Sequence, residues 1–374
     1  MKKTLIALAA LAAAGSAFAQ SSVTLFGIVD ATLAFGRGNV SNKTQLTNSG
    51  YNSSRLGFRG TEDLGGGMSA SFWLEAGVNN DSGAGAATNT NNQASGGALA
   101  GLAGGQGLTF NRRSTVSLAG GWGELRLGRD YSPQFWNLTV FDPYGTNGVG
   151  TTQTLNSAIT GVTAVRASNS IAYFLPANLG GMYGQFQYYL GENNTGATHK
   201  DGTGYGLRLG YAAGPLNVAA TLSRTTYNTA GSSGAAIAGA PALVGRVQQN
   251  NIGGQYDFGV GKLMGHYSRD KNGPISAKGW LIGGLIPVGS GEIRLSYSRY
   301  EANAVTALVN DPTQKKLAIG YVHNLSKRTA LYTTWARLKN NGYGAATASQ
   351  GLNGSASLGN ASATGYDFGI RHAF

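Results

Sequence analysis

The chain has 374 residues, a formal net charge of +12, sixty glycines and no cysteine, and only 12% of its residues are charged. Glycine is present at roughly twice, and charge at about half, the share usual in globular proteins, which argues against an ordinary soluble enzyme. Without cysteine there is no disulfide stabilisation. No segment has the roughly 18 consecutive apolar residues of a membrane-spanning helix, so a helical membrane protein is also excluded.

The N-terminus reads as a secretory signal peptide. In the first twenty residues, MKKTLIALAALAAAGSAFAQ, two lysines precede a short apolar run, and Ala-Phe-Ala at 17–19 supplies small residues for cleavage. The apolar run is too short to cross a bilayer as a helix. We therefore expect residues 1–19 to be removed. Residues 20–374 would remain as one domain with a net charge of +10, since both lysines leave with the signal.

The rest of the chain alternates apolar and polar residues in pieces of about nine, which is the pattern of strands in an outer-membrane barrel. Short turns and long polar stretches separate these pieces in strict alternation. Seven short and eight long connections would join sixteen strands. A soluble β protein has no reason to sort its loops by length, whereas an outer-membrane barrel has short periplasmic turns and long external loops. The short turns are expected near 60–67, 119–123, 175–181, 212–215, 258–261, 287–291 and 323–328, and the long stretches near 36–50, 79–108, 131–165, 191–203, 226–249, 270–277, 301–314 and 339–364.

The stretch 53–66, SSRLGFRGTEDLGG, illustrates the two faces of such a strand. Leu56 and Phe58 share one face, and Arg55 and Arg59 share the other. In a membrane barrel the apolar face meets lipid, and the polar face meets a water-filled lumen. The residues that we predict to line the lumen are Asp30, Arg55, Arg59, Trp73, Glu75, Arg113, Arg166, Arg208 and Arg294.

The first predicted strand, 23–35, can pair with the last, 366–374, and close the sheet. Closure is required because lipid does not tolerate the unpaired backbone groups of an open edge. Sixteen strands enclose an aqueous channel, whereas eight would be filled by side chains. The fold predicted from the sequence is therefore an all-β, 16-stranded antiparallel transmembrane β-barrel.

No catalytic, cofactor or metal site is predicted. The four histidines are scattered, and no hydrolase, zinc or phosphate-loop motif occurs in its required context. The glycine-rich run GLAGGQG, residues 101–107, precedes a strand rather than a helix and is not a nucleotide site. The basic residues are spread singly along the strands, so no nucleic-acid partner is expected.

The chain resembles the general trimeric porins of Gram-negative outer membranes along essentially its whole length. Each shared motif alone is weak evidence for the family, but the motifs together, in this order and at this spacing, are specific for it. The motifs are SSVTLFGIVDA (21–31), SRLGFRGTEDLGGGMSASFWLE (54–75), FNRRSTVSLAGGWGELRLGRD (110–130), RASNSIAYF (166–174), NLSKRTALY (324–332) and GYDFGIRHAF (365–374).

The resemblance implies that the third long loop, about 131–165, folds into the barrel and narrows it. It also implies that Arg55, Arg129 and Arg166 form the basic cluster of the pore wall. Alternation supports Arg55 and Arg166. Arg129, however, falls on the face of the lipid-facing leucines of its strand, so a bulge is required there. A further basic position of the family is Ile28 in this chain.

The family's inward loop usually carries acids that face these arginines. Between residues 131 and 165 the chain has one acid, Asp142, and no base, so the constriction should be net positive and favour anions. Asp142 can equally begin a turn, because Asp-Pro is a turn signal. Glu75 and Asp30 can equally serve only to neutralise neighbouring arginines, and Arg113, Arg208 and Arg294 can be solvated wall residues.

The resemblance further implies a homotrimer in the outer membrane that contacts its lipids and passes small anionic and neutral solutes by diffusion. Phe374, which follows alternating aromatic and apolar residues, resembles the terminal signal read by the barrel-assembly machinery; an ordinary edge strand is the alternative. Three other functions stay open at this point. They are a substrate-specific binding channel with lumen aromatics such as Trp73 and Phe26, an outer-membrane enzyme, and a soluble exported β-domain.

Overall fold

A computed structural model describes residues 22–96, 107–152, 161–230, 245–303 and 309–374 of the chain. The predicted signal peptide, residues 1–19, lies outside the described residues. In the described part of the chain, no helix is long and apolar enough to cross a membrane.

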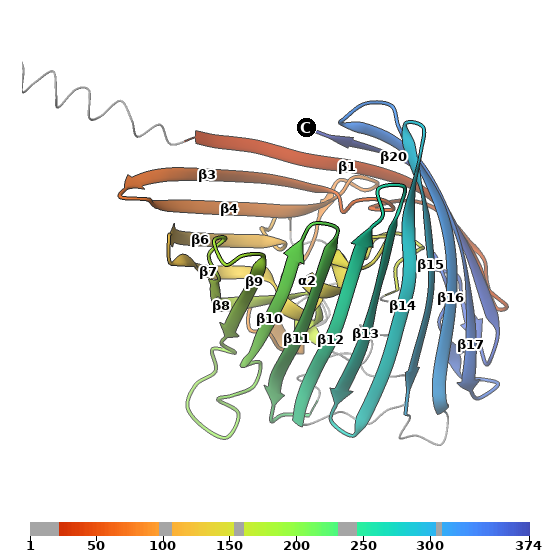
Figure 1. The fold of residues 1–374 in the computed structure, drawn as a ribbon. Helices are drawn as coiled ribbons and strands as arrows, with labels where there is room; N and C mark the ends of the chain where they lie inside the picture. The colour runs from red at the N-terminus through yellow and green to blue at the C-terminus, as the bar shows by residue number, and fades with distance from the viewer. Residues whose placement is uncertain (1–21, 97–106, 153–160, 231–244, 304–308) are drawn as a thin grey trace, which may run out of the picture.

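The fold is a closed antiparallel barrel of sixteen strands, as the sequence predicts (Figure 1). The barrel strands are β1 (Ser22–Arg37), β3 (Arg55–Gly65), β4 (Met68–Asn79), β6 (Arg113–Gly120), β7 (Gly123–Tyr131), β8 (Arg166–Phe174), β9 (Met182–Tyr189), β10 (Gly204–Ala213), β11 (Leu216–Tyr227), β12 (Gly245–Asp257), β13 (Lys262–Asn272), β14 (Ile275–Val288), β15 (Gly291–Ala302), β16 (Val309–Asn324), β17 (Thr329–Tyr343) and β20 (Ser362–Ala373). Short elements in the loops are β2 (Lys43–Asn48), β5 (Ala84–Gly85), β18 (Ala348–Ser349), β19 (Ser357–Leu358), the 3-10 turns η1 (Ala94–Gly96) and η3 (Val162–Ala164), and the helix α2 (Pro133–Val140).

The barrel is closed by pairing of the first strand with the last. β1 and β20 are in antiparallel register from Ile28 opposite Ala373 to Arg37 opposite Thr364. The terminal Phe374 extends this ladder, because its backbone N–H donates to the Gly27 carbonyl and its carbonyl accepts from the Gly27 N–H, both at 3.1 Å. The other edge of β1 pairs with β3 and, nearer the loops, with β2. The closure predicted from the sequence is confirmed: within the described residues, no barrel strand is left with an open edge.

The two faces of the strands differ as the alternation predicts. Large apolar side chains on the outer face remain exposed, for example Leu209 (45% exposed) in β10 and Phe368 (61%) in β20. Polar side chains on the inner face are buried, for example Thr221 in β11 and Asn251 in β12. This is the inverse of a water-soluble β protein and suits a barrel with lipid outside.

Two predicted connections are wrong in detail. Residues 270–277 are no long loop, because β13 ends at Asn272 and β14 begins at Ile275; Gly273 takes a positive φ of 58° and Pro274 completes a tight hairpin. The region 60–67 is mostly strand, since β3 runs to Gly65 and only a turn of positive-φ glycines remains. Glycine and proline mark the turn but do not reveal how far the strand beside it extends.

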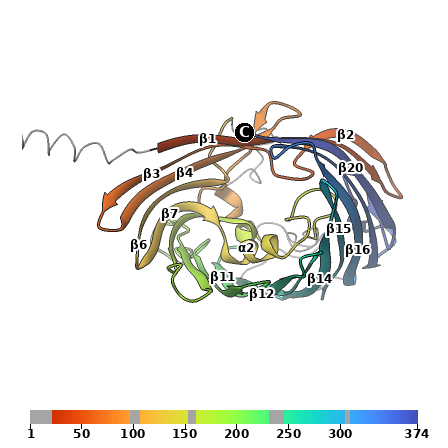
Figure 2. The ribbon, with the colours of Figure 1, turned by 45° about the horizontal axis from the view of Figure 1, so that its top comes forward.

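The third long loop folds into the barrel (Figure 2). After β7 it forms α2, which begins with proline at its first position and contacts the inner faces of β10, β11 and β12. Proline suits this position because the first N–H of a helix has no intrahelical partner. The helix ends at Val140, and its C-cap residue is Phe141, whose ring lies over Gly253 of β12. A side chain at Gly253 would collide with this ring, so the wall is shaped to receive the loop.

We predict that Leu209→Arg destabilises the folded barrel by about 2–4 kcal/mol, because it places a cation on the lipid face near the middle of β10. Urea unfolding in lipid vesicles, followed by tryptophan fluorescence, measures this change. Thr61→Arg introduces the same charge on the inner face of β3 and should leave the free energy of unfolding nearly unchanged. Equal loss in both variants would contradict the assignment of the two faces.

Candidate functional site

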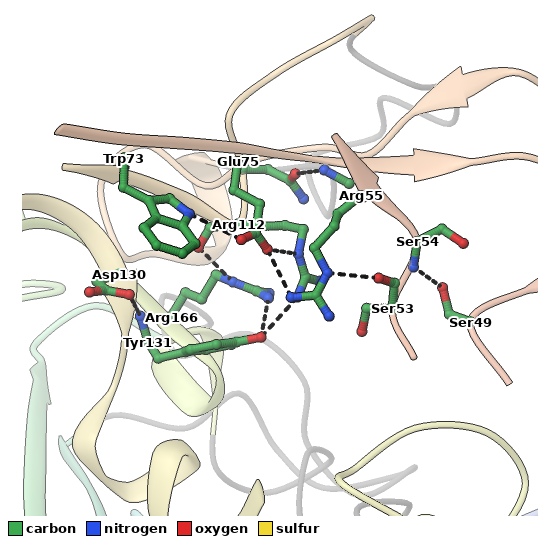
Figure 3. A network of polar contacts seen from close by, with 12 residues as sticks. Ser49, Ser53, Ser54, Arg55, Trp73, Glu75, Arg112, Asp130, Tyr131 and Arg166 are labelled. Carbon is green, nitrogen blue, oxygen red and sulfur yellow. Dashed lines mark hydrogen bonds and ion pairs between the residues drawn. The ribbon is translucent and has the colours of Figure 1, made fainter. Parts of the chain in front are cut away.

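A network of arginines lies on the inner wall along the neighbouring strands β3, β4, β6, β7 and β8 (Figure 3). Its centre is the carboxylate of Glu75 on β4. Arg112 Nε lies 2.5 Å and Arg55 Nη1 lies 3.3 Å from Glu75 Oε1. Trp73 Nε1 donates to the other carboxylate oxygen at 3.1 Å. The side chains of Glu75 and Arg112 are 7% and 9% exposed, whereas that of Arg55 is 24% exposed. Arg55 is thus the more accessible cation of this pair of arginines.

Tyr131 joins two arginines of this network from the end of β7. Its hydroxyl accepts from Arg112 Nη2 at 2.9 Å and from Arg166 Nη2 at 3.1 Å. The Arg166 guanidinium also lies over the Tyr131 ring, 4.6 Å from its centroid, and its Nε donates to the Arg112 carbonyl at 2.9 Å. Cation–π contact and hydrogen bonds hold the guanidinium groups close together without neutralising them.

The backbone before β3 positions Arg55. Asp30 of β1 is fully buried, and its carboxylate accepts from the backbone N–H groups of Tyr51 at 2.9 Å and Asn52 at 2.6 Å. The hydroxyl of Tyr332 on β17 donates to the same carboxylate. The Asp30 carboxylate therefore binds the segment that leads into Arg55 rather than a neighbouring arginine.

Arg129 reaches the inner side through the bulge that the alternation argument requires. The register of β7 against β8 shifts between Gly128 and Asp130, and Gly128 has a φ of 120° that suits glycine. Arg129 Nη1 donates to Ser168 Oγ at 2.7 Å, and its Nε donates to the Asn111 carbonyl at 2.6 Å. Ser168 is on β8, two residues from Arg166, so both predicted arginines lie in one region of the wall.

A ladder of arginines and aromatic rings lies beside this network. Arg59 lies 5.1 Å from the Trp73 ring centroid and 5.3 Å from that of Phe26, and Arg113 lies 4.6 Å from Trp73. The rings of Phe26 and Trp73 meet edge to face at 5.0 Å. All four residues come from the adjacent strands β1, β3, β4 and β6.

The inner surface also holds residues that the sequence analysis missed. Arg112 precedes β6, so strand alternation does not apply to it, and only its place in the Arg-Arg pair before a strand marks it. Arg126 lies 4.0 Å from the Phe174 ring and forms ion pairs with Glu124 (2.8 Å) and Asp130 (2.7 Å). Its charge is therefore largely compensated, unlike that of the Arg55 network.

The first part of the inward loop is held to the wall by side-chain amides. Asn137 of α2 donates to the Ala219 carbonyl at 3.0 Å and to Asn251 Oδ1 at 2.8 Å, and it accepts from Arg208 Nε at 2.9 Å. Arg208 also contacts the ring of Tyr183 at 4.8 Å. Arg208 contacts α2 and is only 5% exposed. It positions the loop and is no free pore charge.

The second part of the loop is held by β15, β16 and β20. The Val149 N–H donates to Asp367 at 2.7 Å, and Lys316 donates to the Thr151 carbonyl. The Tyr144 hydroxyl donates to the backbone carbonyl of Arg294 at 3.0 Å. The side chain of Arg294 pairs with Glu292 and lies 4.3 Å from the Tyr51 ring. The loop is thus fixed at both ends.

Asp142 does not face the arginine network. It is 2% exposed, and its carboxylate accepts from the Tyr144 N–H at 2.8 Å and from the Thr152 hydroxyl at 3.3 Å. Burial raises the pKa of this carboxyl, and the hydrogen bonds from its own loop oppose that rise. The turn role is therefore the one that the contacts support, and the expected carboxylate opposite the arginines is absent at this position. The acid that does meet the network is Glu75.

The charges of this region do not cancel. Arg55, Arg112 and Arg166 share one carboxylate, Glu75, which leaves two net positive charges, and Arg129 adds a third nearby. A closed membrane barrel that is narrowed by an internal loop and lined by excess guanidinium groups can pass water-soluble solutes and bias them by charge. Fold and site together define an outer-membrane channel.

Comparisons with known proteins agree with this class. The family model described as Gram-negative porin matches residues 4–343. The chain is 38% identical to outer membrane porin protein 32 of Delftia acidovorans, with all of both chains covered. It is 28% identical to an outer membrane porin protein of Bordetella pertussis, again over the full length of both. The chain therefore belongs to the Gram-negative porin family and is an outer-membrane porin.

Solved structures share the architecture. The anion-selective porin from Comamonas acidovorans is 36% identical, covers 95% of this chain and 100% of its own, and superposes with a TM-score of 0.78. A trimer form of OmpT from Vibrio cholerae is 14% identical, covers 95% of this chain and 99% of its own, and has a TM-score of 0.61. The second likeness concerns the fold alone.

We predict that Asn137→Ala raises the mean single-channel conductance and its fluctuation, because α2 loses its amide contacts to β10, β11 and β12. Single-channel recording in planar bilayers measures both quantities. Gln248→Ala, on the outer face of β12, removes a similar side chain without touching α2 and should conduct as the unaltered protein does. Unchanged conductance of Asn137→Ala would mean that this amide does not hold the loop in place.

Proposed function

We propose that this porin lets small hydrophilic solutes diffuse passively through the outer membrane and prefers anions. The proposal rests on the net positive charge of the arginine network, in which Arg55, Arg112 and Arg166 surround the single carboxylate of Glu75. Steric sieving by the inward loop and electrostatic bias by this network are its two mechanisms. The anion-selective porin from Comamonas acidovorans, which shares 36% of the sequence, supports the same preference here.

The bias follows from the setting of the charges. The barrel wall is a medium of low dielectric constant that focuses field lines from the guanidinium groups into the water beside them. At about 0.1 M salt the Debye length is roughly 10 Å, so the field reaches across a narrow constriction and weakens as salt rises. Arg55, Arg129 and Arg166 are the members that we assign from both the sequence and the contacts, and Arg112 joins them from the contacts alone.

A substrate-specific binding channel is less well supported. Stacking of sugars requires open aromatic faces in the lumen, and the sequence offers Trp73 and Phe26. In the structure Arg59 lies over both rings and Arg113 lies over Trp73. Because cations already cover these faces, the rings act with the arginines rather than as a sugar platform.

We further propose that the mature protein is residues 20–374 and acts as a channel, not an enzyme. By analogy with the family it would assemble as a homotrimer. Its last strand would be read by the barrel-assembly machinery. In support, Phe374 completes the β1–β20 ladder and its ring lies over Gly27, which has no side chain to obstruct it.

We predict that Arg166→Gln lowers the zero-current potential of the channel to roughly two thirds of its original value, because the net charge of the four arginines and Glu75 falls from three to two. The measurement uses a tenfold KCl gradient at low salt, in which an ideally anion-selective pore gives about 59 mV. The unaltered protein should show the sign of chloride preference, and the potential should shrink at high salt. The control is Arg328→Gln, which removes one positive charge from the short turn between β16 and β17. This variant should leave the zero-current potential unaltered. A potassium-signed potential for the unaltered protein would refute the anion preference.

We predict the opposite shift for Glu75→Gln. This variant keeps the size of the side chain but removes the one carboxylate that meets the network, so the potential should move further toward the chloride limit at the same gradient. Heat-modifiable migration on gels verifies that the barrel has folded. A shift toward potassium in folded protein would mean that Glu75 does not compensate these arginines.

A further inference from the structure

The inward loop carries an open aromatic ring inside the barrel. Helix α2 lies within the ring of strands (Figure 2) and buries most of its side chains, Phe135 and Asn137 among them. Trp136 is the exception, since 39% of it is exposed. The other two tryptophans with large exposed areas are Trp122, in a short turn, and Trp280, on the outer face of β14. Trp136 is thus the tryptophan that offers a largely exposed ring to the interior of the channel.

A pocket of about 390 Å³ lies beside this ring. Tyr131 and Trp136 line it from the loop, and side chains of the strands β6 to β10 line it from the wall. Phe174 at the end of β8 and Tyr183 near the start of β9 place the pocket toward the short turns, beyond the arginine network around Glu75. Small-molecule sites have volumes of roughly 300–1,000 Å³, so this pocket suits a small ligand with a single ring.

Four aromatic rings line the pocket, but their faces are not equally free. Guanidinium groups lie over the rings of Phe174 and Tyr183, at 4.0 and 4.8 Å from the centroids, and another lies over Tyr131 at 4.6 Å. Trp136 meets Tyr131 with the centroids 5.4 Å apart and the planes tilted by 52°. Among the described residues, no cation lies over the Trp136 ring. An aromatic ligand can therefore stack on Trp136 without displacing an arginine.

The pocket carries one net positive charge. Arg126 pairs with Glu124 at 2.8 Å and with Asp130 at 2.7 Å, and Asp130 also lies 3.6 Å from Arg113. Arg208 instead donates to a side-chain amide of α2 at 2.9 Å and to a tyrosine hydroxyl of β9 at 3.3 Å, and it forms no ion pair with a carboxylate of the described residues. Arg208 is thus fixed in the wall, but neither of these neutral partners cancels its charge.

These features together define the chemistry of a ligand. An open tryptophan face favours a planar aromatic ring. A single uncompensated guanidinium group favours a monoanion, and arginine binds a carboxylate more strongly than it binds a neutral acceptor. A neutral sugar would leave the charge without a partner, and a nucleotide would bring more negative charge and more volume than the pocket can match.

We propose that this pocket is a subsite for small aromatic monocarboxylates, of which benzoate is the simplest. The ring stacks on Trp136, and the uncompensated charge of Arg208 attracts the carboxylate. This subsite rests on the proposed anion preference, because the solute must also pass the arginine network around Glu75. Binding has to be weak enough to let the solute leave, as in any conducting pore. The subsite therefore raises the local concentration of aromatic acids beside the constriction without excluding other solutes.

The test measures how much of the KCl current through the unaltered porin is blocked by added solute, in planar bilayers at a fixed KCl concentration. Benzoate is compared with cyclohexanecarboxylate, which has the same charge and no aromatic ring, and with benzamide, which has the ring and no charge. The block by benzoate should saturate and reach half its maximum at a concentration about fivefold lower than for either analogue, as expected for one aromatic contact. Because the two acids have similar apolar areas, partition into an apolar crevice would affect both alike.

The variant Trp136→Leu keeps an apolar side chain and removes the aromatic ring. It should raise the concentration of benzoate for half-maximal block about fivefold and abolish the advantage of benzoate over cyclohexanecarboxylate. The matched control, Trp280→Leu on the outer face of β14, should stay within about twofold of the unaltered protein, because it is distant from the pocket. Heat-modifiable migration on gels verifies that both variants have folded.

Three outcomes would overturn the proposal. Equal block by benzoate and cyclohexanecarboxylate would show that the ring is not recognised, and equal block by benzamide would show that the charge is not. Unaltered block by benzoate in folded Trp136→Leu would place its binding elsewhere in the channel. The zero-current potential, recorded in the same bilayers, separates the two proposals. With a chloride-signed potential these outcomes refute the subsite alone, whereas a potassium-signed potential refutes the anion preference on which it rests.

Discussion

Backbone hydrogen bonding in lipid is the constraint on which the other features of this protein depend. An unpaired N–H or C=O in the bilayer core costs several kcal/mol, so a sheet can cross it only if its two edges meet. Here the ladder from Ile28 to Arg37 against β20 makes that closure, and Phe374 extends it by two further hydrogen bonds to Gly27. Once the sheet is closed, successive side chains must alternate between lipid and an interior that water reaches.

The interior of the barrel then needs polar groups that neither collapse onto one another nor fill the space. The inward loop meets this need on one side, where amides such as Asn137 and the buried Lys316 bond to backbone carbonyls. On the opposite wall, aromatic rings lie between the arginines, and few carboxylates form ion pairs with them. Cation–π contacts matter here because they hold guanidinium groups in place without cancelling their charge. The positive field of the channel therefore results from how the arginines are packed.

Most of the fold could be predicted from the sequence, because alternation, loop sorting and the need for closure are all properties of local sequence. Those rules also located Arg55 and Arg166 on the inner wall and required the bulge at Arg129, which glycine at 128 permits. They could not locate Arg112, which precedes its strand and follows no alternation. They also left Asp142 open between a pore role and a turn role, because the hydrogen bonds that bury its carboxylate come from a loop conformation that no periodicity encodes.

The same alternation that lines the lumen also puts cations on the outside, and the two sets of charges act under different conditions. Inside, low-dielectric walls surround the water, so a few net charges bias every solute that passes. Outside, the head-group region is wet and screened beyond roughly 10 Å, so a single lysine there has little effect.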